Sequence, residues 1–140
     1  MTDNLDLTDD HFCFVCGRDN PDGLRIQFQY PEKGVCRAEF VPLQKFQGWK
    51  DILHGGIVST LLDEALAHAV GGPARSGGGS YSVTAELTVR FKRPVPIGQL
   101  VILEGRVIRD KGKVIECESS LKDMAGVELA SATGKLIRPR

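Results

Sequence analysis

His54, Gly55 and Gly56 stand together at the start of a segment with helical periodicity. Paired glycines at a helix start let a ligand approach the backbone, and the unpaired amides there, together with the helix dipole, stabilise negative charge. We therefore predict that the Gly56 amide binds the oxyanion that forms when a carbonyl is attacked. The same glycines would also suit a plain tight turn. His54 is expected to orient this turn or to contact the substrate, and a histidine held only by a hydrogen bond is equally compatible with the pattern.

Asp63 follows Gly56 by seven residues, which is about 10 Å along a helix axis. It therefore cannot act at the start of its own helix. If two such helices pack antiparallel about a two-fold axis, Asp63 of one chain comes near Gly56 of the other. The carboxylate would then act as a general base toward water or as a nucleophile, and the sequence leaves both roles open. Glu64 points about 100° away and precedes His68 by four residues, so it is predicted to form a helix pair and support the substrate site.

The segment that must carry these residues is the one convincing helix, predicted from Gly55 to Val70. Its apolar residues fall on one stripe, and Gly71, Gly72 and Pro73 end it. No Lys or Arg occurs from position 51 to 74, which predicts that the helix is covered on nearly all sides. A second subunit is a suitable cover for the side opposite the stripe, where the residues are small or acidic: Ser59, Thr60, Asp63 and Ala67.

The rest of the chain reads as strands. Alternation predicts an early hairpin from 24–30 and 35–41, and four later strands at 81–95, 100–109, 113–121 and 127–137. One helix between two early and four late strands indicates an α+β fold, in which a curved antiparallel sheet buries its concave face on the helix. We predict a single domain over 1–140, with 1–23 as a tail and an irregular arm. The glycine-rich stretch up to Gly79 is predicted to form a loop at the rim of the pocket.

Composition narrows the possible partners. The 18 basic and 18 acidic residues cancel, which argues against nucleic acid. No apolar run approaches the roughly 18 residues of a membrane span, and the polar start lacks the pattern of a signal peptide. We therefore predict a soluble, cytoplasmic protein without a membrane partner.

The four cysteines are predicted to be reduced, because a domain of this size needs no disulfide. Cys13 and Cys16 form a CxxC after His11, which offers at most three clustered zinc ligands, and no second pair follows at finger-like spacing. Turn residues after the CxxC argue against a redox helix. The sequence thus favours small side chains that pack the arm, with no metal and no cofactor.

Several segments together resemble the hotdog thioesterase superfamily, specifically its phenylacetate-pathway type. The resemblance covers nearly the whole chain and lies in Gln47-Gly48-Trp49, His54-Gly55-Gly56-Ile57, Leu62-Asp63-Glu64-Ala65 and Thr84 to Pro94, with one branch of the family matched by Cys13 to Cys16 and Asn20 to Leu24. It implies a hotdog fold of about six strands wrapped around one long central helix. It also implies that the Gly56 amide forms the oxyanion hole, that Asp63 of the partner chain is base or nucleophile, and that the Thr84 hydroxyl helps to hold the water. A homodimer with a continuous sheet, often doubled into a homotetramer, is implied as well.

Thr84 does not fit this role by alternation alone. A regular strand places it on the polar face with Glu86, Thr88 and Arg90, so that reaching the site requires the strand edge or a local bulge. A plain β-branched strand residue is the alternative.

The predicted reaction is hydrolysis of an acyl-CoA or similar acyl thioester. The predicted substrate contacts are Gly55, Trp49, Glu64, Arg90 and Lys92, with the basic residues placed to meet coenzyme A phosphates. A hotdog hydratase or dehydratase would share fold and substrate but should pair a catalytic histidine with a carboxylate. A non-catalytic module that binds acyl thioesters is the second alternative, and the acid inside an apolar helix argues against it.

Overall fold

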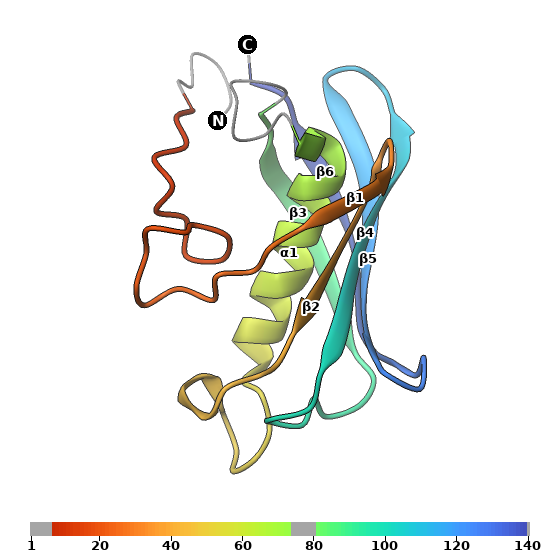
Figure 1. The fold of residues 1–140 in the computed structure, drawn as a ribbon. Coiled ribbons are helices and arrows are strands. Elements are labelled where there is room, and N and C mark those ends of the chain that lie inside the picture. The colour runs from red at the N-terminus through yellow and green to blue at the C-terminus, as the bar shows by residue number, and fades with distance from the viewer. Residues whose placement is uncertain (1–6, 74–80, 140) are drawn as a thin grey trace.

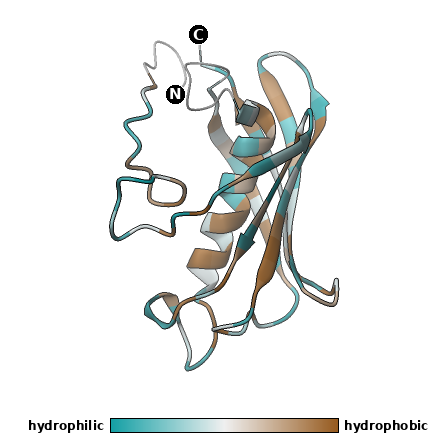
Figure 2. Ribbon diagram, viewed as in Figure 1, coloured by the Kyte–Doolittle hydropathy of each residue, from teal (hydrophilic) through white to brown (hydrophobic). Residues whose placement is uncertain are grey.

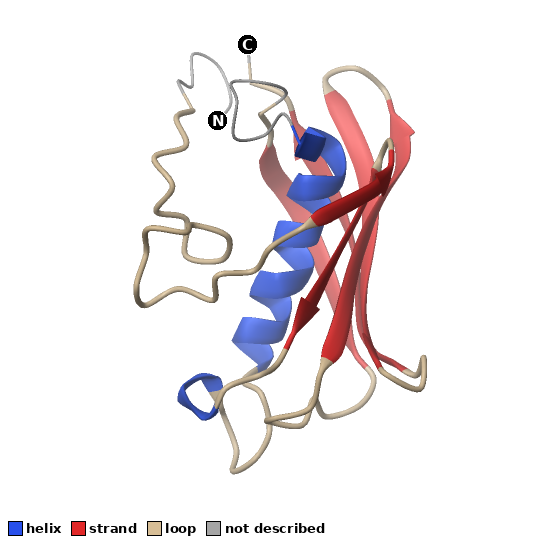
Figure 3. Cartoon of the chain, viewed as in Figure 1, coloured by secondary structure: helices blue, strands red, loops and turns tan. Residues whose placement is uncertain are grey.

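The computed structural model describes residues 7–73 and 81–139. One antiparallel six-stranded sheet curves around a single helix, as Figure 1 and Figure 3 show, and the strand order is β1-β2-β4-β5-β6-β3. The predicted α+β class, with a curved sheet of six strands around one central helix, is confirmed. In chain order the elements are β1 (Gln29–Glu32), β2 (Val35–Phe40), the 3-10 helix η1 (Gln44–Phe46), α1 (Gly55–Gly71), β3 (Val83–Phe91), β4 (Val101–Asp110), β5 (Val114–Asp123) and β6 (Glu128–Ile137).

The core lies between α1 and the concave face of the sheet, where Figure 2 shows apolar segments of both. Two glycines of the sheet let the helix approach closely. A Cβ atom at Gly105 would lie 2.2 Å from the Ala65 carbonyl oxygen, and one at Gly134 would lie 2.6 Å from Leu66 Cδ1. The Ser119 hydroxyl also donates to the Leu62 carbonyl of the helix at 2.9 Å. These contacts fix the depth at which the helix sits, and with it the side chains that the helix carries.

The helix begins at Gly55 as predicted and ends at Gly71, one residue later than predicted, with Gly72 at φ 58 as its C-cap. Its stripe is buried, including Leu61, Leu62 and Ala65. The opposite side, including Asp63, is only half-buried in the single chain. The predicted cover on nearly all sides is therefore incomplete within one chain.

The first predicted strand is wrong. The alternation over 24–30 does bury Leu24 and Ile26, but their amides donate to Phe14 and Val15 carbonyls of the arm, at 2.8 Å each, and not to the sheet. Arg25, between them, has φ 55, which no regular strand adopts. The pairing with β2 starts only at Gln29, so β1 is short and includes Pro31, where a turn was predicted. The short helix η1 was not predicted.

Strand β3 contains a bulge near its start. Thr84 is paired with Leu136 of β6, and Glu86 is paired with the adjacent Lys135, so Ala85 is an extra residue. One extra residue reverses the face on which the preceding side chains lie. Thr84 therefore points toward the helix, although Glu86 and later even-numbered residues lie on the outer face.

Two predictions concern residues outside the described ranges. The glycine-rich rim of 74–79 lies outside them, and so do the first six residues of the predicted tail and arm of 1–23. No helix within the described residues is long and apolar enough to span a bilayer.

Candidate active site

The start of α1 is built as a histidine N-cap. The Gly56 amide donates to His54 Nδ1 at 2.8 Å, while the His54 carbonyl accepts from the amides of Ile57 and Val58. Asp, Asn, Ser and Thr are the usual residues here, so the imidazole takes the part of their side-chain oxygen. The Gly56 N–H, predicted to hold an oxyanion, is therefore already bonded to His54.

A cleft of about 850 Å³ opens beside this N-terminus. Three of the predicted substrate contacts line it, namely Trp49, Gly55 and Lys92, and His54 lines it as well. The Trp49 side chain is 84% exposed in the single chain. Gly56 is not among the lining residues, so the glycine that faces the cleft is the one before it. The remaining walls are mainly apolar: Ile52, Leu53, Val58, Phe91, Pro94, Val95 and Ala130.

Asp63 lies in the middle of the helix and accepts a hydrogen bond from the Thr84 hydroxyl at 2.7 Å. Both side chains are half-buried. The bulge in β3 turns Thr84 toward the helix and so allows this contact. A local bulge of this kind was one of the two ways in which Thr84 was expected from the sequence to reach the site. Neither residue lines the cleft at the N-terminus of the same helix.

Glu64 faces the N-terminal arm and not the cleft. It is 8% exposed, and its Oε2 lies 3.2 Å from His68 Nε2, which confirms the predicted helix pair. The Tyr30 hydroxyl lies 2.7 Å from His68 Nδ1, and Phe28 stacks on the imidazole at 4.0 Å between ring centroids. The predicted substrate contact of Glu64 has no counterpart in the lining of the cleft.

The arm meets Glu64 through its CxxC. The Cys13 thiol donates to Glu64 Oε2 at 3.5 Å, and Cys13 and Cys16 are not joined by a disulfide. The hydrogen bond from the Cys16 side chain lowers the pKa of Cys13 to about 6, against the opposing effects of burial and of the Glu64 charge. Backbone amides of Cys16 and Val15 act in the same direction as the Cys16 thiol.

Arg90, a predicted substrate contact, is exposed on the outer face of β3 and does not line the cleft. Lys92 does, and it is paired with Glu128. Sequence reasoning missed Phe91, whose side chain is 60% exposed yet lies on the helix side of the sheet. Its signal was present, because Leu87, Val89 and Phe91 alternate toward the helix, and a strand end that exposes an aromatic ring on that face indicates a binding surface.

Comparison with known proteins gives a consistent result. The family model of the thioesterase superfamily matches residues 50–130, which include His54, Asp63 and Thr84. The chain is 31% identical over 108 residues to acyl-coenzyme A thioesterase THEM4 of Bos taurus, covering 76% of this chain but only 41% of that protein.

Solved structures share the fold. Protein RHA08564, a thioesterase superfamily protein, has a TM-score of 0.76 at 26% identity, over 88% of this chain and 61% of that one. The PaaI protein of the Escherichia coli phenylacetic acid degradation operon has a TM-score of 0.73 at 20% identity, over 84% of this chain and 81% of that one. The predicted resemblance is thereby confirmed, and the chain belongs to the thioesterase superfamily.

Proposed function

We propose that this protein hydrolyses an acyl-CoA or a similar acyl thioester to a carboxylic acid and a free thiol. The observation that carries the proposal is the position of Asp63. This carboxylate lies on α1, accepts a hydrogen bond from Thr84 of β3, and shares its helix with the N-terminus that opens onto a mainly apolar cleft. Membership of the thioesterase superfamily and the similarity to a bovine acyl-coenzyme A thioesterase support it. The cytoplasm as its location stays a prediction.

The oxyanion hole is assigned to the start of α1, with the Gly55 amide in place of the Gly56 amide predicted from the sequence. Gly56 donates to His54, whereas Gly55 lines the cleft and leaves room for a carbonyl because it has no side chain. His54 then positions the first turn through the cap. The helix dipole adds to the stabilisation of the developing negative charge.

The site is proposed to be shared between two chains. Gly55 and Asp63 are eight residues apart on one helix, which is about 12 Å along its axis, so they cannot act on one carbon from the same chain. A homodimer in which the half-buried side of α1 faces its copy would place Asp63 of the partner at the Gly55 cleft, twice by symmetry. The absence of Lys and Arg on that side suits such a contact, and a homotetramer would repeat it.

In the proposed reaction a water oxygen attacks the thioester carbonyl, and Asp63 accepts the proton from that water. The resulting oxyanion is bound at Gly55, the carbon–sulfur bond then breaks, and the thiolate leaves and takes up the proton. Thr84 fixes the rotamer of Asp63 through its hydrogen bond. Direct attack by Asp63 would pass through an anhydride instead, with water entering in a second step.

Substrate binding is assigned to the cleft. Its apolar walls suit the acyl group, with Trp49 and Phe91 as exposed aromatic surfaces at its rim. Lys92 and Arg93 line the same cleft and are proposed to meet coenzyme A phosphates, whereas Arg90 lies on the outer face of the strand. If water attacks directly, no covalent intermediate forms between the acyl group and the protein.

The test is a panel of acyl-CoA substrates with detection of the released thiol. Asp63→Asn and Asp63→Ala should lose most of kcat while remaining folded, and Asp22→Asn, on the exposed arm, should be unaffected. Undiminished turnover in the Asp63 variants would exclude the assignment. Binding of an acyl thioester without turnover by the wild type would identify a non-catalytic binding module instead.

Shared sites are tested by mixing two inactive variants. A dimer of one Asp63→Ala chain and one Gly55→Val chain has one intact site and one site with both defects. Random mixing makes half of the dimers mixed, so about a quarter of wild-type activity should return. No recovery after verified chain exchange would show that each site is made by a single chain.

A further inference from the structure

The arm contains a tight turn that presents two thiols on the same side. The Gly17 amide donates to the Cys13 carbonyl at 2.9 Å and closes the turn directly after Cys16. A Cβ atom at position 17 would lie 2.3 Å from the Cys13 nitrogen and 2.5 Å from its carbonyl oxygen. Only glycine permits this closure, so the sequence Cys-x-x-Cys-Gly has a geometric reason to end as it does.

Backbone amides point at the first sulfur of this turn. The Val15 amide donates to Cys13 Sγ at 3.4 Å, and the Cys16 amide also bonds to the Cys13 side chain. Amide donors on a sulfur stabilise its thiolate form, which is the form that binds metal ions. The turn is thus arranged for an anionic sulfur and not for a thiol that merely fills space.

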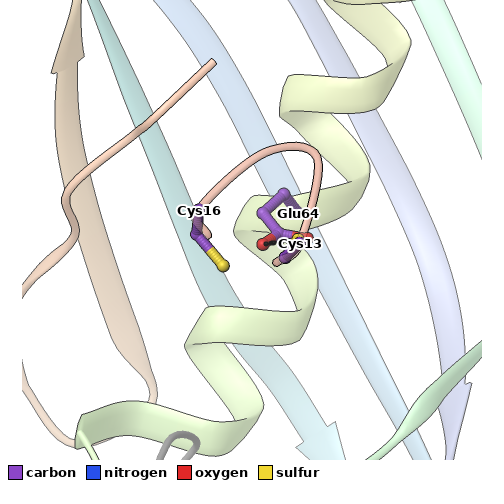
Figure 4. A group of neighbouring side chains, drawn as sticks. All are labelled: Cys13, Cys16 and Glu64. Atoms are coloured by element: carbon purple, nitrogen blue, oxygen red, sulfur yellow. Dashed lines mark hydrogen bonds between the residues drawn. The ribbon is translucent and has the colours of Figure 1, made fainter. Parts of the chain in front are cut away.

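A third ligand comes from the helix. Glu64 Oε2 lies beside the turn, and one ligand atom from each of Cys13, Cys16 and Glu64 is within 4.8 Å of the others. Figure 4 shows the loop with both cysteines lying over α1 at Glu64. Around a tetrahedral zinc ion, ligand atoms are separated by about 3.5–3.8 Å, so the three groups need to close by about 1.3 Å at most.

The carboxylate is held by a chain of groups behind it. With the Tyr30 hydroxyl donating to His68 Nδ1, the Nε2–H of His68 donates to Glu64 Oε2. Phe28 stacks on the imidazole and fixes its plane. Hydrogen bonds that orient a ligating group in this manner are typical of metal sites, and they commonly involve histidine and carboxylate together.

We propose that Cys13, Cys16 and Glu64 bind a zinc ion that fastens the N-terminal arm to the central helix. In the zinc-bound state both sulfurs are thiolates, so the three ligands carry three negative charges against two positive ones. A water molecule completes the tetrahedron. The site would fix the helix turn next to Asp63, but it takes no part in the hydrolysis proposed above.

The sequence favoured no metal because only three clustered candidates were visible, with His11 as the third. In the structure the third candidate is Glu64, which lies 51 residues from Cys13 in the chain. Two thiolates and one carboxylate, with a short CxxC spacing, are ligands that zinc accepts, whereas magnesium and calcium prefer sets of oxygen atoms.

The first experiment measures zinc in the wild-type protein. Reduced, chelator-treated protein is titrated with zinc in competition with a chromophoric chelator, and with cobalt as a spectroscopic probe. We expect one ion per chain, and a sulfur-to-cobalt charge-transfer band in the near ultraviolet. No uptake of either ion by folded, fully reduced protein would overturn the proposal, and so would a Cys13–Cys16 disulfide found by thiol counting in freshly purified protein.

The second experiment compares variants. Cys13→Ser, Cys16→Ser and Glu64→Gln should each weaken zinc binding by at least about 10-fold, since each removes one ligand charge. Cys117→Ala is the matched control, because Cys117 is buried in a cluster with Leu66, Ile115 and Leu136 and its loss should leave zinc binding unchanged. Equal zinc binding in Cys13→Ser and Cys117→Ala would overturn the site. Circular dichroism of each zinc-free variant verifies its fold. If a variant does not fold, the zinc titration of the wild-type protein decides the question instead.

Discussion

Replacing Thr84 by valine removes one hydroxyl and keeps the β-branched shape of the side chain. In the structure that hydroxyl donates to Asp63 Oδ1 at 2.7 Å. The bulge at Ala85 turns Thr84 to the helix side of the sheet, where this hydrogen bond forms. A hydrogen bond to a charged group contributes about 1.5–3 kcal/mol. If it serves to hold Asp63 in the reactive rotamer, its loss corresponds to about a 10- to 150-fold decrease in kcat. Because both side chains are only half-buried, we expect the lower end of this range.

The assay is thiol release from an acyl-CoA substrate, with kcat and KM determined separately. Thr84→Ser keeps the donor and should retain most of kcat. Thr88→Val is the matched control, since it makes the same change on the outer, exposed face of the same strand and should be neutral. The reasoning is refuted if Thr84→Val and Thr88→Val have the same kcat. It is also refuted if the decrease in activity of Thr84→Val is fully explained by a smaller fraction of folded protein.

Three further predictions concern the start of α1, the packing of α1 against the sheet, and an ion pair. Gly55→Ala should fold normally, because its Cβ meets only ordinary contacts from 3.5 Å, but it should lose kcat/KM at least about 10-fold by crowding the carbonyl; enzyme assays and melting curves separate the two effects. Gly105→Ala should lower stability by about 3 kcal/mol and Tm by about 10 °C, because the added Cβ meets a helix carbonyl oxygen at 2.2 Å, and an unchanged Tm would contradict the packing described here. The hydrogen bonds from Arg138 lower the pKa of Asp110 to about 2, so Arg138→Ala should raise it toward about 3.9, as NMR titration would measure. The stability that this ion pair contributes is small because both groups are solvent-screened; it is present above about pH 4 and is lost as the pH falls toward 2, and an unchanged Asp110 pKa in the variant would contradict the assignment.

The helix and the four later strands could be predicted from the sequence because their apolar periods are long and are interrupted by clear turns. Gly112 and Gly126, for example, have positive φ in the two turns that separate the last three strands. The first strand could not, because the alternation at Leu24 and Ile26 only shows burial and does not say which backbone the amides bond to. Burial against an irregular arm and burial in a sheet give the same pattern of residues.

The residues of the candidate site were recognised more readily than their contacts. Asp63 and Thr84 were both selected, but the bulge that joins them depends on pairing with β6, about fifty residues further along the chain. The bond from Gly56 to His54 depends on one side-chain rotamer, which no pattern of residue types encodes. The contact between Cys13 and Glu64 needed the fold itself, because helical spacing accounts only for the pair of Glu64 with His68.

The two borders of the sheet differ in a way that limits how copies of this protein can join. Strand β1 has four residues, is irregularly paired and contains Pro31, so it is a poor template for a further strand. Strand β3 at the other border has nine residues, and within the described residues its outer side is not paired. A chain with one usable border can extend its sheet once, by meeting the same border of a second copy, and the joined sheet then ends in two β1 strands. In the proposed dimer growth would stop there, and the protein would be protected against polymerising into fibres through its own sheet.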